Sequence, residues 1–245
     1  MNTNLGGPMR YIREALKIFM PKNVAMRLVN TNIRCNAAAP GATIKIALKL
    51  LYRRSGQKKS DGLCQWNSKE EVMNILVLNG SPRPNGSTAA MVEAFVEGAS
   101  ENGHNITVVP ICQKKIAGCL ACEYCHTKGN GRCIQKDDMQ EVYPVLEEAE
   151  MIVLASPVYY HGFTGQLQCA INRIYALDKP KKLKKAALIL SSGSDDVYGG
   201  AIYEYRNSFL DYLKLEDMGI FTAFGKQNKS EEKMDELWEF GRHLR

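Results

Sequence analysis

The sequence predicts a three-layer α/β domain in which helices cover both faces of a doubly wound parallel sheet. From Met73 onward, strand-length apolar runs alternate with helix-length amphipathic stretches. Each run is almost continuously apolar, which is typical of parallel strands that are covered on both faces. The five runs are Ile75–Leu78, Ile106–Val109, Ile152–Ala155, Ala186–Leu190 and Ile220–Phe224.

The stretches between these runs carry a helical pattern. Apolar residues at helical spacing follow the first run, and a second set lies near the C-terminus. Strands joined by such helices imply right-handed crossovers and a doubly wound sheet. The two sets are Met91, Val92, Phe95, Val96 and Ala99, and Met234, Leu237, Trp238 and Leu244.

Residues 1–72 do not share this rhythm, and we expect them to form a basic, poorly ordered N-terminal extension. Residues 1–70 hold 13 Lys or Arg against 3 Asp or Glu, a balance of +10, which leaves −4 for the rest of a chain whose total is +6. Ile44–Leu51 could form a short basic amphipathic helix, which would suit a membrane surface or a partner. The alternatives are a disordered extension or upstream sequence that is not natural coding sequence.

The composition is that of an ordinary globular protein, with 45% hydrophobic and 24% charged residues. No run approaches the roughly 20 apolar residues of a membrane-spanning helix. The N-terminus lacks a secretory signal pattern, so we expect a cytoplasmic protein. The pI of 8.8 derives from the basic front segment and does not indicate nucleic-acid binding.

The loop after the first strand, Asn79–Thr88, is rich in hydroxyl groups and leads directly into a helix. The free N–H groups at a helix start form an anion site. The loop lacks the lysine of an ATP-binding P-loop and the G-x-G-x-x-G pattern, so a monophosphate fits better than a pyrophosphate. An ordinary turn with capping Ser and Thr is the alternative. The side chains that could hold a phosphate are Ser81, Arg83, Ser87 and Thr88.

Two further loops follow central strands, where doubly wound folds bind ligands. In the first, Pro157 stiffens the exit from the strand, and Tyr159 and Tyr160 offer faces for stacking on a flat ring. The alternative makes both tyrosines surface aromatics and His161 a solvated loop residue. In the second, Ser191–Gly193, small residues let a ligand approach the backbone closely.

The segments Asn79–Thr88, Ser156–Tyr160 and Leu167–Arg173 resemble the NADPH-dependent FMN reductases, and the branch that looks most similar is the iron-sulfur flavoproteins. The resemblance covers about residues 73–245, which we expect to form one FMN-binding domain. It implies a flavodoxin-like fold with a five-stranded parallel sheet in the order 2-1-3-4-5. Gln168 and Asn172 depart from the Lys and Asp that the family usually has at these positions.

The resemblance also assigns the three loops to FMN. It implies that Ser81, Arg83, Ser87 and Thr88 bind the phosphate. It implies that two sets surround the isoalloxazine, namely Pro157, Val158, Tyr159, Tyr160, His161 and Gly162, and Ser191, Ser192 and Gly193.

Four of the eight cysteines lie within fifteen residues, at Cys119, Cys122, Cys125 and Cys133. Close C-x2-C spacings let several thiolates converge on one inorganic core, and four thiolates suit a [4Fe–4S] cluster. The lysines and arginines around this segment, Lys114, Lys115, Lys128 and Arg132, would offset its negative charge. Because the segment follows the second strand, we expect it beside the flavin loops. A structural zinc site and a metal-free loop are the alternatives.

Together these features predict an oxidoreductase that moves electrons from NAD(P)H or a protein donor through FMN, and then to the cluster or an acceptor. The flavin performs such chemistry, and no catalytic acid or base is assigned. The alternatives are a metal-free NAD(P)H-dependent FMN, quinone or azo-dye reductase, and a flavodoxin-like electron carrier without its own substrate. We expect small-molecule or protein electron donors and acceptors, and a homo-oligomer.

Overall fold

The computed structural model of the chain describes residues 72–245. The expected basic extension, its Ile44–Leu51 helix and the cysteines at 35 and 64 lie outside these residues, apart from Val72 at the end of the extension.

The centre of the domain is a five-stranded sheet in the order β2-β1-β3-β4-β5, and all four strand pairs are parallel. This confirms the predicted fold class, strand number and order, and every predicted apolar run lies within its strand. The strands are β1 (Asn74–Asn79), β2 (Asn105–Pro110), β3 (Met151–Pro157), β4 (Lys185–Ser192) and β5 (Glu216–Phe224).

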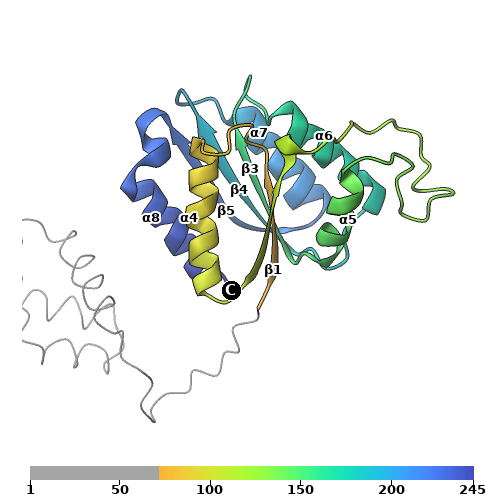
Figure 1. Cartoon of the computed structure of the whole chain (residues 1–245), viewed down its shortest axis with the longest axis horizontal. Coiled ribbons are helices and arrows are strands. Elements are labelled where there is room, and N and C mark those ends of the chain that lie inside the picture. Colours follow the sequence, from red (N-terminus) through yellow and green to blue (C-terminus); the bar gives the residue numbers. More distant parts are fainter. Residues whose placement is uncertain (1–71) are drawn as a thin grey trace, which may run out of the picture. The chain divides into compact units, whose positions relative to one another are not determined.

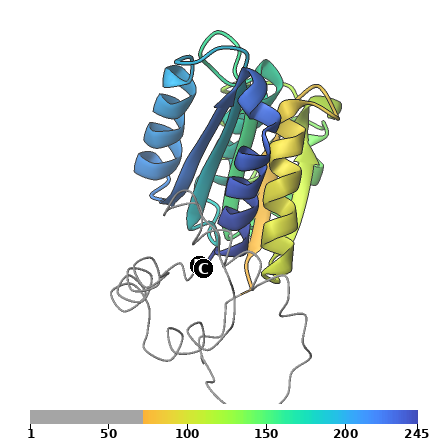
Figure 2. The ribbon, with the colours of Figure 1, turned by 90° about the vertical axis from the view of Figure 1, so that its left-hand side faces the viewer.

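Helices cover both faces of the sheet (Figure 1). One face carries α4 (Ser87–Glu101) and α8 (Glu231–Arg242), which lie side by side in Figure 2. Their apolar residues pack on alternate residues of the strands, such as Val77 and Val153. The opposite face carries α5 (Met139–Glu148), α6 (Gly165–Ile174), α7 (Gly199–Glu204) and the π-helix η3 (Tyr205–Tyr212). Short 3-10 turns follow β2, α6 and β5, namely η1 (Ile111–Gln113), η2 (Tyr175–Leu177) and η4 (Gly225–Lys229).

Two glycines let α4 and α8 pack closely. A Cβ atom on Gly98 would lie 2.0 Å from the carbonyl oxygen of Trp238, and one on Gly241 would lie 2.4 Å from the carbonyl oxygen of Phe95. Atoms cannot approach so closely, so the crossing requires glycine on both helices.

The edge strand β2 departs from the expected burial on both faces. Val109 is buried, whereas Asn105, Thr107 and Val108 are exposed, Val108 to 40%. An edge strand has a neighbouring strand on one side only, so a continuous apolar run there does not mean that both faces are covered. The expectation drawn from the apolar run is therefore wrong for β2.

None of the helices between Val72 and Arg245 combines the length and hydrophobicity needed to cross a bilayer. Because all strands are parallel, the loops that follow them emerge at one edge of the sheet, its carboxyl edge. The three loops predicted to bind a ligand all begin at this edge.

Candidate functional site

Hydrogen bonds tie the loops that follow β1, β3 and β4 to one another at the carboxyl edge. The Thr88 and Ser191 hydroxyls lie 2.7 Å apart, and the Val158 N–H donates to the Ser191 carbonyl at 2.8 Å. The Gly80 N–H donates to the Ala155 carbonyl at 2.8 Å. The structure therefore brings together the three segments that the sequence analysis singled out.

The loop between β1 and α4 is shaped by its own polar groups. The Asn79 side chain accepts from the Ser81 N–H at 2.9 Å, and the Ser81 hydroxyl bonds to the Arg83 backbone. A Cβ atom on Gly80 would lie 2.8 Å from the Leu167 Cβ and from the Thr164 hydroxyl, so the start of α6 packs directly against the loop. Only glycine fits at this contact.

The first turn of α4 is open to an anion. Its N-cap is Gly86, and no side chain of the described residues caps the helix. The first N–H groups of a helix have no intrahelical partner, and the helix dipole favours negative charge there. Ser87 is half-buried and Arg83 is exposed beside this turn. The arrangement can accept a phosphate group.

The side chains of Thr88 and Ser191 do not face the ligand space that the sequence indicated. Both side chains are buried, and their hydroxyls bond to each other. The Thr88 hydroxyl therefore joins two loops, and the group of Thr88 that remains open to an anion is its backbone N–H at the helix start.

The loop after β3 forms a tight hairpin whose tip is Tyr160 and His161. Tyr159 and Gly162 exchange backbone hydrogen bonds at 3.1 and 3.0 Å. Tyr160 and His161 both have left-handed backbone φ angles, 49° and 64°, which residues other than glycine rarely adopt. The Tyr160 side chain is fully exposed and that of Tyr159 is half-exposed. Both rings are therefore accessible at the rim, as stacking on a flat ring requires.

The loop after β4 borders open space. A Cβ atom on Gly193 would meet no atom of the described residues within 4 Å, so a ligand can approach the backbone there. The Ser192 hydroxyl is 2.5 Å from the Ser194 carbonyl and 2.9 Å from the Tyr198 hydroxyl. The side chain of Ser192 therefore shapes the loop, as that of Ser191 does.

Two residues of η4 join the same edge and were missed in the sequence. The Asn228 side chain donates to the Ser192 carbonyl at 2.8 Å. The Lys229 ammonium donates to the Asn85 carbonyl at 3.0 Å and so brings a second cation to the loop that holds Arg83. Their position directly after the fifth predicted strand was the signal that could have found them.

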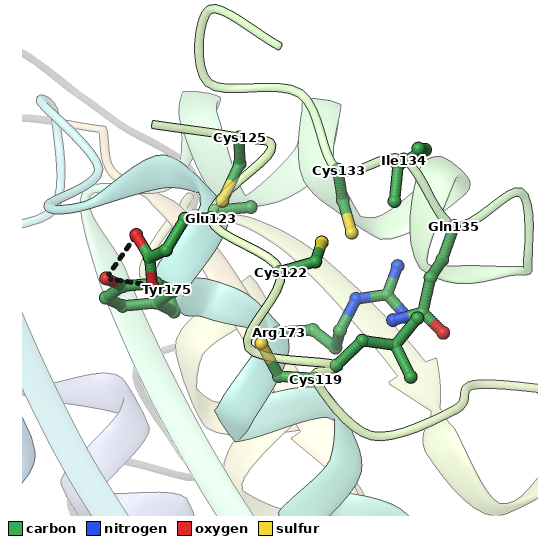
Figure 3. Close-up of a pocket in the computed structure, with 11 residues that line it drawn as sticks. Cys119, Cys122, Glu123, Cys125, Cys133, Ile134, Gln135, Arg173 and Tyr175 are labelled. Carbon is green, nitrogen blue, oxygen red and sulfur yellow. Dashed lines mark hydrogen bonds between the residues drawn. The ribbon is translucent and has the colours of Figure 1, made fainter. Parts of the chain in front are cut away.

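The four clustered cysteines lie in the long loop between η1 and α5 and line one pocket, together with Arg173 and Tyr175 (Figure 3). Cys119 and Cys122 are exposed, Cys133 is half-buried and Cys125 is buried. Burial raises the pKa of the Cys125 thiol. Within residues 72–245, no three His, Cys, Asp or Glu side chains are grouped closely enough to hold a metal ion.

Left-handed backbone turns fold this loop back on itself. Ala121, Glu123, Asn130 and Gly131 all have positive φ angles between 47° and 80°. The Gly131 N–H donates to the Cys125 carbonyl at 2.8 Å, and the Ala121 N–H donates to the Cys119 sulfur at 3.4 Å.

A buried ion pair fixes both ends of the cysteine loop. Asp137 accepts two hydrogen bonds from the Arg173 guanidinium, at 2.7 and 3.1 Å, and further bonds from the N–H groups of Ala117 and Met139. Burial alone would raise the pKa of Asp137, but the bonds from Arg173 and Ala117 outweigh it and the pKa is lowered. Burial raises the pKa of Tyr143, whose hydroxyl donates to the Arg173 carbonyl, to about 12.

The position of the cysteine pocket corrects the expectation that it lies beside the flavin loops. The loop projects from the side of the domain beside α5 and α6 (Figure 1), and the pocket is lined by Arg173, Tyr175 and Ala176. Helix α6 begins at the carboxyl edge with Gly165, so Arg173 lies about 12 Å further along its axis at 1.5 Å per residue. Within one chain, the cysteines and the carboxyl-edge loops therefore meet opposite ends of α6.

The charges that the sequence placed around the cysteines also differ. Lys114 pairs with Glu141 at 2.6 Å, and the cation that lines the pocket is Arg173, from a helix 40 residues beyond Cys133.

At the two positions that depart from the usual family pattern, the Gln168 amide donates to Glu204 at 2.7 Å and to Asn172 at 3.3 Å. These bonds lie on the surface of α6 that faces α7.

Comparison with known proteins gives one family. The family described as NADPH-dependent FMN reductase matches residues 73–229. A protein of Archaeoglobus fulgidus called iron-sulfur flavoprotein is 32% identical over 62% of this chain and 69% of its own length. An iron-sulfur flavoprotein of Methanocaldococcus jannaschii is 36% identical over 50% of this chain and 63% of its own length. The chain thus spans about two thirds of the length of these relatives.

Among solved structures, the NAD(P)H:quinone oxidoreductase from Methanothermobacter marburgensis aligns with a TM-score of 0.55 at 18% identity. The alignment covers 71% of this chain and all of that one. At this identity the similarity is one of fold.

Proposed function

Because the chain belongs to the family of NADPH-dependent FMN reductases, we propose that it is a cytoplasmic oxidoreductase that moves electrons from NAD(P)H or a protein donor through bound FMN. The observation that carries this proposal is the meeting of three loops at the carboxyl edge, beside the uncapped start of α4. FMN, when bound, supplies the hydride and electron chemistry, and the protein binds and orients it.

Backbone N–H groups and side chains at the start of α4 together bind the FMN phosphate. The N–H groups of the first turn donate to the phosphate, and Arg83 supplies a positive charge beside them. The Ser81 and Ser87 hydroxyls add neutral donors. Lys229, held against the Asn85 carbonyl, adds a second positive charge to the same loop.

The other two loops bind the isoalloxazine in this proposal. The backbone of Pro157–Gly162 and the open face of Gly193 border the space where a flat ring would lie. The exposed rings of Tyr159 and Tyr160 can stack on it and exclude water. The bond from Ala201 to the His161 carbonyl, 2.8 Å long, holds the hairpin that carries both tyrosines.

The finer proposal is a [4Fe–4S] cluster bound by Cys119, Cys122, Cys125 and Cys133. All four thiols line one pocket, which is the donor set that such a cluster takes, and the unpaired N–H of Arg173 in that pocket suits a thiolate or sulfide acceptor. Two relatives are called iron-sulfur flavoproteins. Binding would require the loop to bring the four thiols closer together. Its left-handed turns already fold the backbone so that the cysteines lie around one pocket.

The test is a visible spectrum of anaerobically purified protein, with analysis of iron, sulfide and zinc and an assay of NADH and NADPH oxidation. We expect bound flavin that a nicotinamide reduces, with about four iron and four sulfide per chain. Flavin without metal would leave a metal-free reductase, and zinc would make the cysteines a structural site. Flavin that only a partner reductase reduces would indicate an electron carrier. Absence of flavin binding would overturn the proposal.

A further inference from the structure

The side chain of Arg173 has one unsatisfied donor inside the cysteine pocket. Arg173 is 1% exposed, and its Nη1 and Nη2 atoms donate to Asp137 at 2.7 and 3.1 Å. Nη1 also donates to the Ala117 carbonyl at 3.0 Å. The Nε atom is buried and has no hydrogen-bond partner among residues 72–245. A buried N–H of a charged group without an acceptor is costly, so its presence needs an explanation.

The surroundings of this atom point to an acceptor that contains sulfur. Figure 3 shows the guanidinium directed toward the side of the pocket that holds Cys122, Cys133 and Gln135. The Tyr143 hydroxyl donates to the Arg173 carbonyl, and Cys133 packs against the apolar cluster that contains Tyr143. The other charged side chain that lines the pocket, Glu123, accepts from the Tyr175 hydroxyl at 3.1 Å. The side chains on that side of the pocket that can accept from Nε are the Cys122 and Cys133 sulfurs and the Gln135 amide oxygen, and of these only a metal-bound thiolate carries negative charge.

We propose that Arg173 is a positioning residue for the cysteine-bound group, whose Nε–H donates to a thiolate or sulfide sulfur while Asp137 fixes the rest of the guanidinium. This rests on the proposed [4Fe–4S] cluster. Such a bond stabilises the more negative, reduced form of the cluster, because the added electron increases the charge on the sulfurs. Arg173 therefore raises the tendency of the cluster to accept an electron.

The ion pair explains why an arginine is required. A lysine ammonium is a single point donor and cannot both replace the two bonds to Asp137 and reach a sulfur on the other side. The planar guanidinium donates twice to Asp137 and once to the Ala117 carbonyl, and it aims its Nε–H along a fixed direction. Arg173→Lys keeps the charge and removes the Nε–H donor.

Two variants separate this role from a purely structural one. In Arg173→Lys we expect the ratio of reduced to oxidised cluster at a fixed potential to fall at least tenfold, a shift of about 59 mV for a one-electron couple. In Asp137→Asn the amide oxygen still accepts from the guanidinium and keeps it in place, while a negative charge is lost, so the potential should stay or rise. If Arg173 only holds the loop, both variants loosen the same contact and shift the potential in the same direction, which would overturn the proposal.

A direct measurement needs no change at Arg173. In protein labelled with 15N-arginine, pulsed EPR of the reduced cluster should show a 15N coupling that persists in Arg132→Lys, which removes the arginine of the cysteine loop itself. Loss of the coupling in Arg132→Lys, or its absence in the parent chain, would overturn the proposal. A cluster that assembles without this coupling contradicts the role of Arg173 alone. A chain that assembles no cluster contradicts this role and the proposed cluster together, while flavin binding tests the rest of the proposed function.

Discussion

Replacing Asp137 by Ala should destabilise the fold far more than removing a nearby surface carboxylate on α5. The Asp137 side chain is 17% exposed and its partner Arg173 is 1% exposed. Asp137→Ala leaves a buried guanidinium without its counterion and removes the acceptor of the Ala117 and Met139 N–H groups. Breaking a buried pair in this way costs about 3–5 kcal/mol, and the partial exposure of Asp137 places the expected loss near the lower value.

The matched control is Glu141→Ala, which removes the partner of Lys114. This pair also connects the cysteine loop to α5, but its side chains are 69% and 23% exposed. An exposed pair contributes at most about 1 kcal/mol. Urea denaturation of the three proteins without cofactors measures both losses, and with slopes of about 1–3 kcal/mol per molar the Asp137→Ala midpoint should fall by at least about 1 M. Equal losses in the two variants would refute the reasoning.

The pH dependence gives a second check on the same pair. The pKa of Asp137 is lowered in the fold, below its ordinary value of 3.8. Its contribution to stability is therefore fully present above that value and is lost as the pH falls through the lowered pKa. The difference in unfolding free energy between the parent and Asp137→Ala should be constant above about pH 5 and shrink below about pH 4. A difference that grows toward low pH would contradict the assigned direction.

Three further predictions concern the cofactors and the domain boundary. Arg83→Ala should weaken FMN binding by about 1–3 kcal/mol in a titration of the apoprotein, with Arg206→Ala on η3 as a control that leaves affinity unchanged. A chain that begins at Met73 should fold and bind FMN like the full chain, and a large fall in its melting temperature would show that the preceding residues stabilise the domain. Replacing any one of the four clustered cysteines by Ser should remove iron and sulfide while FMN stays bound; these are Cys119, Cys122, Cys125 and Cys133. Cys112→Ser and Cys169→Ser should retain the cluster.

The strands could be predicted because each strand of a parallel sheet is marked locally in the sequence by its apolar residues. Each strand is a short apolar run, and the alternation with helices is sufficient to order them. The burial of β2 could not be predicted, because Val108 is as apolar as its buried neighbour Val109 and differs only in pointing to the opposite face of this edge strand. The π-helix η3 likewise has no apolar spacing that would separate it from an α-helix.

The site was predictable where its residues follow a strand directly. The loops at Ser81–Thr88, Pro157–Gly162 and Ser191–Gly193 meet because the carboxyl ends of parallel strands share an edge. Contacts between distant residues were not predictable. Lys229 meets Asn85 across 144 residues, and Arg173 meets Asp137 across 36 residues. That second contact draws the cysteine loop to the far end of α6, which the cysteine spacing alone could not indicate.

The central claim is that the carboxyl-edge loops hold FMN by its phosphate, and a comparison of FMN with riboflavin tests it most directly. Riboflavin keeps the isoalloxazine but lacks the phosphate that would meet the start of α4, Arg83 and Lys229. Titration of the apoprotein should give FMN an affinity at least tenfold higher, since one charge-assisted hydrogen bond contributes about 1.5–3 kcal/mol. Equal affinities for the two flavins would contradict the assignment of the phosphate to this loop.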